Sequence, residues 1–174
     1  HMALTGPAGT GKTTVARIIG RILFSAGAVP GDRFTEVQAK DLVSWYVGGT
    51  SEETAKLIER ALGGVLFIDE AYALVESSSG QEALAVLVKA MEDRKGEHVV
   101  MLAGYDGPMR AFMDANPGLA SRIGYRLRFE DYEPDDLTEM FRRQMEAAGF
   151  VLGEGARARA PGALRYLHHV EDSG

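Results

Sequence analysis

A glycine-rich segment near the start of the chain constrains the possible fold more than any other feature. The segment, Gly6-Pro-Ala-Gly-Thr-Gly-Lys-Thr13, follows a short apolar run at residues 2–5 and precedes apolar residues with helical spacing over 12–26. A strand, a glycine loop and a helix in this order make a phosphate-binding unit, because the loop N–H groups and the helix N-terminus both attract anions. The alternative is an ordinary glycine-rich turn, which would not require a strand before it and a helix after it.

The residue types in this loop match the chemistry of a nucleotide phosphate chain. Glycines bring the backbone close to the phosphates without a clash of Cβ atoms. Lys12 supplies a positive charge to the β- and γ-phosphates of ATP, and the Thr13 hydroxyl is a ligand for Mg²⁺. The residues predicted to contact the nucleotide here are Gly6, Pro7, Ala8, Gly9, Thr10, Gly11, Lys12, Thr13 and Thr14.

Two adjacent carboxylates follow another apolar run. Val65-Leu-Phe-Ile68 leads directly into Asp69 and Glu70, and open α/β sheets bind ligands at the carboxyl ends of their strands. Asp69 is predicted to bind the nucleotide by holding Mg²⁺ through water. Glu70, on the opposite side by strand alternation, is predicted to polarise the attacking water. A pair of solvated acids in a loop is the alternative, and the preceding apolar run disfavours it.

The rest of the chain alternates apolar strands with amphipathic helices. This pattern predicts a three-layer α/β fold with a parallel sheet covered on both faces. A capping-box pattern at 50–53 opens one helix, and residues 76–80 are predicted to form a flexible loop. The predicted strands are 2–5, 34–37, 65–68, 99–103 and 125–129, and the predicted helices in this part are 12–26, 50–62 and 81–94.

The pattern changes after Tyr132. Beyond this residue it is purely helical, with one helix over 134–148 and a final segment over 154–170. Pro161 lies inside that segment and predicts either two pieces or a kinked helix. We therefore predict an α/β nucleotide-binding subdomain over 1–132 and a partial α-helical lid over 133–174.

Composition excludes several classes of function. The chain of 174 residues has no cysteine, which excludes disulfides and thiol catalysis, and its four histidines lack metal-like spacing. No apolar run reaches the roughly 20 residues that span a membrane, so a soluble, cytoplasmic protein is expected. The net charge of −6 argues against a nucleic-acid partner, because such affinity comes largely from basic residues that neutralise phosphates.

With both motifs in place, the sequence resembles the AAA+ ATPases, specifically the CbxX/CfqX type. That group includes the red-type Rubisco activase, the ATPase of type VII secretion systems and stage V sporulation ATPases. The resemblance runs from about Met2 to Val151. Its most specific stretches are Gly63-Gly-Val-Leu-Phe-Ile-Asp-Glu-Ala-Tyr72, Gly80-Gln-Glu-Ala83, Val100-Met-Leu-Ala-Gly-Tyr105 and Asn116-Pro-Gly-Leu-Ala-Ser-Arg122-Ile123.

The resemblance implies a hexameric ring that hydrolyses ATP and threads or remodels a protein partner. Arg122 matches the arginine finger that reaches the γ-phosphate of the neighbouring subunit. Many relatives end the fourth strand with an Asn or Thr sensor that orients the water. Here that strand leads into Ala103-Gly-Tyr-Asp106, so the sensor is shifted or replaced, with Asp106 as the candidate. The second sensor arginine of the lid would lie beyond the last residue. The triplet that grips the substrate would be Tyr46, Val47 and Gly48.

Three other functions compete with this one. A nucleotide-dependent switch would bind ATP without hydrolysing it appreciably, and the Asp69-Glu70 pair argues against it. A small-molecule kinase would need a phosphoacceptor pocket and lid arginines, and a nucleic-acid translocase is disfavoured by the acidic balance.

Overall fold

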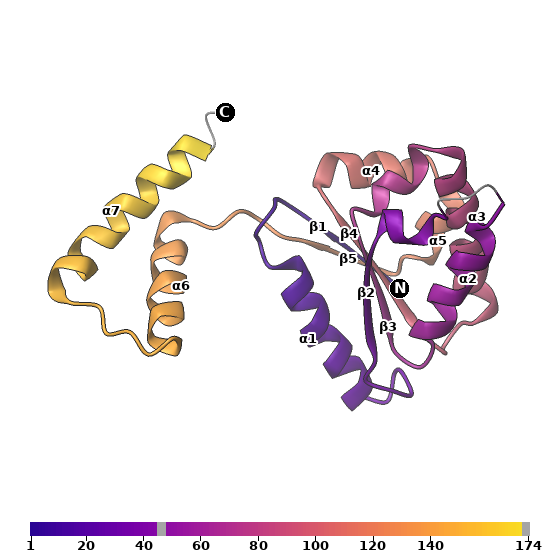
Figure 1. Cartoon of the computed structure of the whole chain (residues 1–174), viewed down its shortest axis with the longest axis horizontal. Coiled ribbons are helices and arrows are strands. Elements are labelled where there is room, and N and C mark those ends of the chain that lie inside the picture. Colours follow the sequence, from indigo (N-terminus) through magenta and orange to yellow (C-terminus); the bar gives the residue numbers. More distant parts are fainter. Residues whose placement is uncertain (45–47, 172–174) are drawn as a thin grey trace. The chain divides into compact units, whose positions relative to one another are not determined.

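A five-stranded, all-parallel sheet organises the first part of the chain. The computed structural model describes residues 1–44 and 48–171, and the chain divides into two compact units, His1–Glu130 and Asp131–Gly174. The sheet of the first unit has the strand order β2-β3-β4-β1-β5 (Figure 1). The predicted α/β fold is confirmed. The strands are β1 (Met2–Thr5), β2 (Phe34–Gln38), β3 (Val65–Asp69), β4 (Val99–Gly104) and β5 (Tyr125–Arg128).

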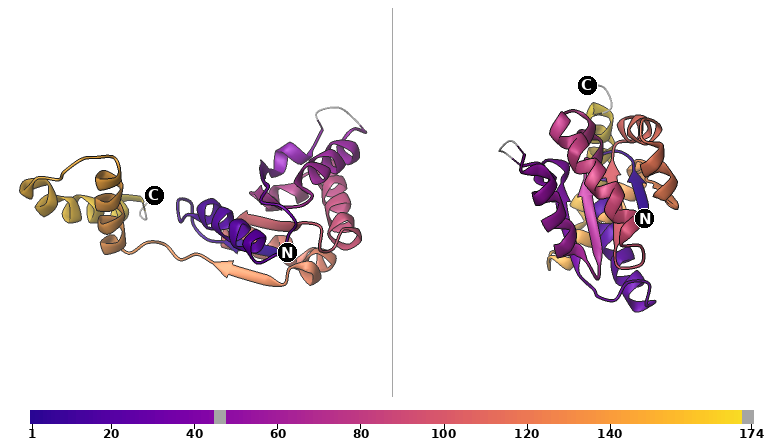
Figure 2. Two further views of the ribbon diagram at one scale, coloured as in Figure 1. Left: turned by 90° about the horizontal axis from the view of Figure 1, so that it is seen from below. Right: turned by 90° about the vertical axis from the view of Figure 1, so that its right-hand side faces the viewer.

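Helices cover both faces of this sheet, unevenly. Figures 1 and 2 show α1 on one face and α2, α3 and α4 on the other. Such coverage is required because every central strand is apolar on both sides. The helical elements of this unit are α1 (Lys12–Ser25), η1 (Ala39–Leu42), α2 (Thr50–Ala61), η2 (Ala71–Val75), α3 (Ser78–Asp93), α4 (Asp106–Asp114) and α5 (Pro117–Arg122), where η marks a 3₁₀ helix.

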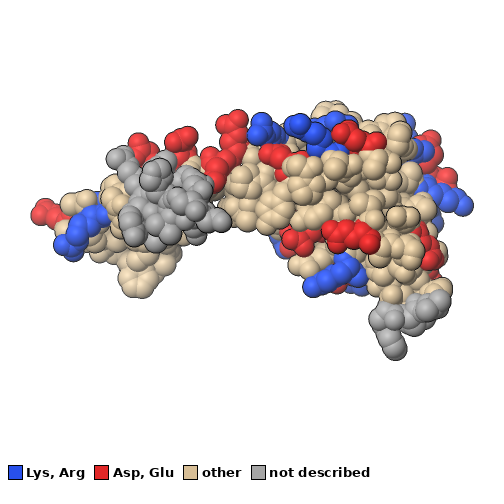
Figure 3. All heavy atoms as spheres, turned by 90° about the horizontal axis from the view of Figure 1, so that it is seen from above, with Lys and Arg blue, Asp and Glu red and all other residues tan. Residues whose placement is uncertain are grey.

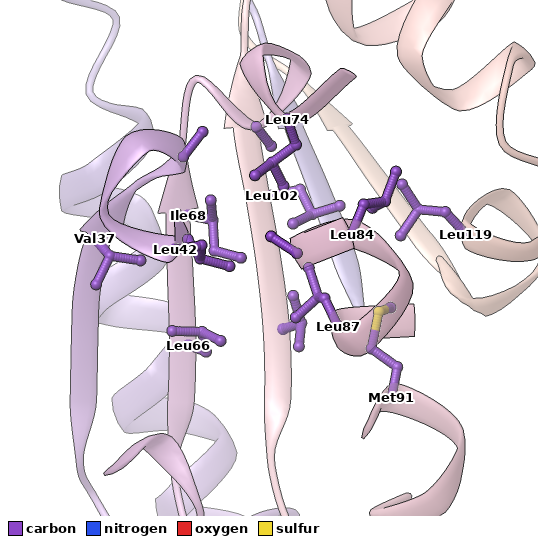
Figure 4. Packing of buried hydrophobic residues seen from close by; sticks show 14 of the residues in the cluster. Val37, Leu42, Leu66, Ile68, Leu74, Leu84, Leu87, Met91, Leu102 and Leu119 are labelled. Carbon is purple, nitrogen blue, oxygen red and sulfur yellow. The ribbon is translucent and has the colours of Figure 1, made fainter. Parts of the chain in front are cut away.

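Strand alternation divides the buried residues into two clusters. Phe67 and Met101 belong to the cluster on the α1 side, while Leu66 and Leu102 belong to the larger one beneath α2 and α3. The larger cluster is drawn in Figure 4, where side chains of β2, β3 and β4 and Leu87 of α3 belong to one continuous group. Burying one such side chain stabilises the fold by about 1.5–3 kcal/mol, so the two clusters hold the carboxyl ends of the strands in a fixed arrangement.

Two local predictions are wrong. Thr50 does not cap α2: Gly49 is the N-cap, and the buried Thr50 hydroxyl accepts a hydrogen bond from Ser44 N at 3.2 Å. Residues 76–80 are not a flexible loop, because α3 begins at Ser78. Its N-cap is Ser77, whose hydroxyl accepts from Gly80 N at 3.0 Å. Serines that look like a loop in sequence thus form a helix cap.

Four short elements were not predicted, namely η1, η2, α4 and α5. Each has at most nine residues, too few for helical periodicity to emerge in the sequence. They form because they pack against the sheet and α3; in α4, Met109 and Phe112 are almost fully buried.

The second unit consists of two helices that contact each other, α6 (Pro134–Ala147) and α7 (Glu154–Glu171). Pro134 occupies the first turn of α6, where its missing N–H costs nothing. Of the two outcomes predicted at Pro161, the division into two helices is wrong, since α7 runs through this residue. Within the described part of the chain, none of the helices has the length and apolar character that a bilayer crossing requires.

Gly80 holds η2 against α3, and we predict that it tolerates no side chain. A Cβ at this position would lie 2.2 Å from the Leu74 carbonyl oxygen, so Gly80→Ala should lower the free energy of unfolding by about 1–3 kcal/mol through overpacking. The control is Gly107→Ala in α4, where a Cβ meets nothing within 4 Å. Urea unfolding of both variants measures the difference. Equal stability of the two would contradict the close approach of η2 and α3.

Candidate nucleotide-binding site

A hollow of about 180 Å³ lies at the carboxyl ends of the sheet, between the glycine loop and the acidic pair. The structure therefore brings together Lys12 and Thr13 from the first motif with Asp69 and Glu70 from the second. They meet because β1 and β3 are both paired with β4, in parallel. The residues that line the hollow are Ala8, Gly9, Lys12, Thr13, Asp69, Glu70, Gly104 and Tyr105.

The loop conformation depends on glycine at defined positions. Gly9 and Gly11 have φ angles of 74° and 85°, which L side chains rarely adopt. A Cβ on Gly6 would lie 2.3 Å from the Phe129 carbonyl oxygen, so the chain after β5 passes directly over this residue. Gly11 is the N-cap of α1, so the N-terminus of this helix faces the loop. The backbone thus forms a cradle that fits a phosphate group.

Lys12 lies inside the curve of the loop. Its Nζ donates hydrogen bonds to the carbonyl oxygens of Gly6 at 2.8 Å and Pro7 at 2.6 Å. The same Nζ lies 5.8 Å from the centre of the Tyr105 ring, within reach of a weak cation–π interaction. Backbone carbonyls and an aromatic face therefore keep the ammonium at the wall of the hollow.

The acidic pair owes its arrangement to the backbone of one residue. Asp69 ends β3, and its Oδ1 accepts a hydrogen bond from Glu70 N at 3.0 Å. Glu70 has φ 51° and ψ 40°, and among the described residues it is the single non-glycine residue with a positive φ. Such a conformation costs of order 1–3 kcal/mol and is typical of functional sites. The direction of Glu70 thus comes from a left-handed turn, and the expectation that strand alternation sets it is wrong.

The sequence reasoning missed the contribution of β4 and η2. Gly104 and Tyr105 line the hollow, and Tyr72 of η2 lies beside Tyr105 with ring centres 6.3 Å apart. A Cβ on Gly104 would lie 2.8 Å from the Tyr72 ring, so only glycine admits that ring. Burial, followed by the negative charge of Glu70, raises the pKa of Tyr72 above its usual value. The available signal was the strand end itself, since β4 is adjacent to β3.

Asp106 and Arg122 lie outside the hollow. Asp106 begins α4 and pairs with Arg128 Nε at 3.1 Å. Its pKa is held below its usual value by a hydrogen bond from the Thr5 hydroxyl, and then by Arg128. Arg122 ends α5 and pairs with Glu92 near the end of α3.

The predicted substrate-gripping triplet is only partly described. Tyr46 and Val47 lie outside the described residues. Gly48 is described, has a φ of 82° and precedes α2 by two residues.

A phosphate-binding loop and an acidic strand end, placed together at the carboxyl edge of a parallel sheet, define a P-loop nucleotide-binding fold. Residues 2–130 match the family described as "ATPase family associated with various cellular activities (AAA)". The chain therefore belongs to the AAA family of ATPases.

Curated relatives confirm the resemblance to the CbxX/CfqX type. Stage V sporulation protein K of Bacillus subtilis is 42% identical over 159 residues, which are 90% of this chain and 49% of that protein. Protein CfxQ of Xanthobacter flavus is 42% identical over 160 residues, which are 90% of this chain and 50% of that protein. ESX-1 secretion system protein EccA1 of Mycobacterium tuberculosis is 44% identical over 146 residues, or 80% and 26%. The chain thus spans a quarter to half the length of these relatives.

Solved structures share the fold. A RuvB variant from Thermotoga maritima aligns with a TM-score of 0.65 at 24% identity, over 92% of this chain and 47% of that one. The FIGL-1 AAA domain in complex with ADP aligns with a TM-score of 0.56 at 25% identity, over 84% and 48%. The AAA fold is thereby shown independently of the sequence match.

The left-handed conformation of Glu70 predicts that this residue lowers the stability of the fold. Glu70→Gly should raise the free energy of unfolding by about 0.5–1 kcal/mol, because glycine adopts this conformation without strain. Glu76→Gly is the matched control: Glu76 is also exposed and ends the same 3₁₀ helix, but its φ is −76°. There the added chain entropy of glycine should lower stability by about 0.5–1 kcal/mol. Urea unfolding distinguishes the two, and a loss of stability in both variants would show that Glu70 is not strained.

Proposed function

We propose that this domain binds Mg-ATP in the hollow between the glycine loop and the acidic pair, and hydrolyses it to ADP and phosphate. The observation that carries this proposal is the meeting of Lys12, Thr13, Asp69 and Glu70 around one space at the carboxyl edge of the sheet. Membership of the AAA family supports nucleotide binding. The glycine cradle supports the placement of the phosphates at residues 6–14.

The oxygen ligands beside the loop suit Mg²⁺. The Thr13 hydroxyl and the Asp69 carboxylate both line the hollow, and hard oxygen donors are what this ion prefers. In the described part of the chain, groups of three or more His, Cys, Asp or Glu that could hold a metal are absent. Phosphate oxygens and water would therefore supply the remaining ligands. When bound, Mg²⁺ neutralises charge on the β- and γ-phosphates.

Glu70 is the residue we assign to the attacking water. Its carboxylate is exposed at the rim of the hollow and can orient a water molecule and accept its proton. The water oxygen forms a bond to the γ-phosphorus as the bond from that phosphorus to the bridging oxygen of ADP breaks. The Glu70 backbone N–H donates a hydrogen bond to the Asp69 carboxylate, and the left-handed turn at Glu70 sets the direction in which its own side chain leaves the strand end.

Lys12 and Tyr105 also line the hollow, and we assign Lys12 to the phosphates. On binding ATP, the Lys12 ammonium would exchange its bonds to the Gly6 and Pro7 carbonyls for bonds to phosphate oxygens. The exchange replaces neutral acceptors with charged ones, which make stronger hydrogen bonds. The Tyr105 ring, just beyond the end of β4, has its centre 5.8 Å from the ammonium nitrogen.

Arg122 is proposed to act on the nucleotide of a neighbouring subunit. The side chain is outside the hollow of its own chain and pairs with Glu92. Glu92 is near the far end of α3, a helix of about 24 Å that begins after η2, the element following Glu70. This separation supports action in trans, within a homo-oligomeric ring that we propose to be a hexamer. Asp106 stays a proposed nucleotide sensor that would act through Thr5 at the start of the loop.

We further propose that the ring remodels or threads a protein partner in the cytoplasm, with residues 46–48 as the gripping segment. Gly48, with its left-handed φ, gives that segment a turn next to α2. A protein partner is favoured over nucleic acid by the net charge of −6. On the face shown in Figure 3, basic side chains are interspersed with acidic ones. The helical unit over 133–174 is proposed to be part of the lid.

We predict that ATP turnover depends on assembly. Turnover per subunit should rise with protein concentration, because each site needs an arginine from another chain. Glu70→Gln should abolish turnover while retaining ATP binding. Arg122→Ala should lower kcat by roughly 10³-fold or more. The measurement is steady-state phosphate release across a concentration series.

The control for this prediction is Arg126→Ala, which removes a nearby exposed arginine of β5 and should leave turnover close to that of the unchanged protein. Turnover that is independent of concentration and insensitive to Arg122→Ala would rule out the shared site. Binding of ATP with no turnover at any concentration would instead favour a nucleotide-dependent switch.

A further inference from the structure

We propose that Glu92 is a positioning residue for Arg122, so that a carboxylate on α3 sets the geometry of the arginine that acts on the neighbouring subunit. The proposal rests on the shared site described above and adds a residue that neither sequence motif contains. The supporting observation is that the Arg122 guanidinium contacts Gly118 and Glu92 of its own chain.

Two contacts define that hold, and one nitrogen of the guanidinium is left without a partner. Arg122 Nη1 donates to the Gly118 carbonyl oxygen at 2.7 Å, one turn earlier in α5. Arg122 Nη2 lies 3.2 Å from Glu92 Oε2. Arg122 Nε is fully buried and makes no hydrogen bond within the described structure. The side chain as a whole keeps 27% of its surface exposed, so the guanidinium is partly accessible although its Nε is buried.

These contacts leave the guanidinium with donors to spare. It has five N–H groups in a rigid plane, and the two contacts that are made occupy one nitrogen each at Nη1 and Nη2. The remaining N–H groups on those two nitrogens can still bind an oxyanion in the bidentate manner that arginine favours. Glu92 and Gly118 thus fix the plane of the guanidinium without blocking it.

Fixing that plane matters because a free arginine side chain carries about 2 kcal/mol of rotamer entropy. A finger that samples many rotamers must lose this freedom each time it meets a γ-phosphate. With the rotamer already selected, the charge is in place when the transition state forms, which is the general advantage of a preorganised site.

The position of Glu92 on α3 also links two catalytic centres. The same helix begins just after η2, which follows Glu70, and Gly80 of α3 packs directly on the Leu74 backbone of η2. A displacement of η2 at the chain's own site would move α3 as a rigid rod. Glu92, at the far end, would carry that displacement to the arginine that serves the next subunit. The helix therefore offers a physical path from one nucleotide site to the next.

The test uses Glu92→Gln, which keeps the side-chain size and removes the charge, with Asp93→Asn as the matched control on the same helix. Glu92→Gln should lower kcat about tenfold while the KM for ATP stays within about twofold, since the ground-state contacts of the nucleotide are unchanged. Asp93→Asn should retain the original kcat. Thermal unfolding should hardly differ, because an exposed ion pair contributes little to stability.

Mixed assemblies separate positioning from damage to the fold. Glu70→Gln subunits have an inactive site but an intact arginine, whereas Glu92→Gln subunits have an intact site but a misplaced arginine. Mixing the two should raise turnover severalfold above the sum of the separate proteins, because the intact arginine now faces the intact site. A misfolded Glu92→Gln subunit would not be rescued, and that result would overturn the proposal.

A second mixture tests the shared nucleotide site separately from the role of Glu92. Mixing Arg122→Ala with Glu70→Gln tests the shared site alone. If that pair restores turnover and Glu92→Gln has no effect on kcat, only the role of Glu92 is wrong. If Glu92→Gln raises kcat, the carboxylate restrains the arginine and the proposal is overturned. If the Arg122→Ala pair fails to restore turnover, the shared site and this inference are both wrong.

Discussion

Parallel pairing of β1 with β4 and β5 is the constraint on which the rest of the structure depends. It places the carboxyl end of β1, from which the glycine loop starts, beside the end of β4, and β3 lies on the other side of β4. The loop then has no freedom to move away, because Gly6 lies so close to the Phe129 backbone that any Cβ would overlap it. Helix α1 follows at once from Gly11 and packs on the Phe67 and Met101 side of the sheet. The packing of the core thereby fixes the position of the glycine loop.

Around this edge the protein accepts local costs for the sake of geometry. Glu70 adopts a left-handed backbone conformation that residues with a side chain rarely adopt. Gly104 gives up a side chain so that the Tyr72 ring can lie against the strand end. Glu70 and Gly104 both line the hollow at the carboxyl edge of the sheet. The two buried clusters supply the stability that offsets these costs.

The two ends of α3 show how such a domain can connect one site with another. At its first turn the helix is capped by Ser77 and packed on η2, the element that follows Glu70. At its last turn Glu92 contacts Arg122 of α5. Between these ends Leu84 and Leu87 are buried in the larger cluster, so the helix cannot rotate about its axis without disrupting the core. This packing is the basis for the proposal that a change at one end of α3 reaches the other end.

The sequence by itself determined the strands, the long helices, the glycine loop and the acidic pair, because these depend on local spacing and on residue types with few alternative uses. Gly6–Thr13 and Val65–Glu70 could be interpreted without knowledge of their neighbours, and family membership followed from their order. Only the tertiary structure decided the left-handed turn at Glu70, the cap at Ser77, the short helices η1, η2, α4 and α5, and the presence of Tyr105 beside Lys12. The short helices and the Tyr105–Lys12 contact depend on packing between residues far apart in the chain, which exists only after the sheet has formed. The Ser77 cap and the Glu70 turn are local, but their residue types suit several backbone conformations, so the structure was needed to choose among them. The pairing of Glu92 with Arg122 belongs to this second group, because it joins residues of two different helices that no sequence pattern relates.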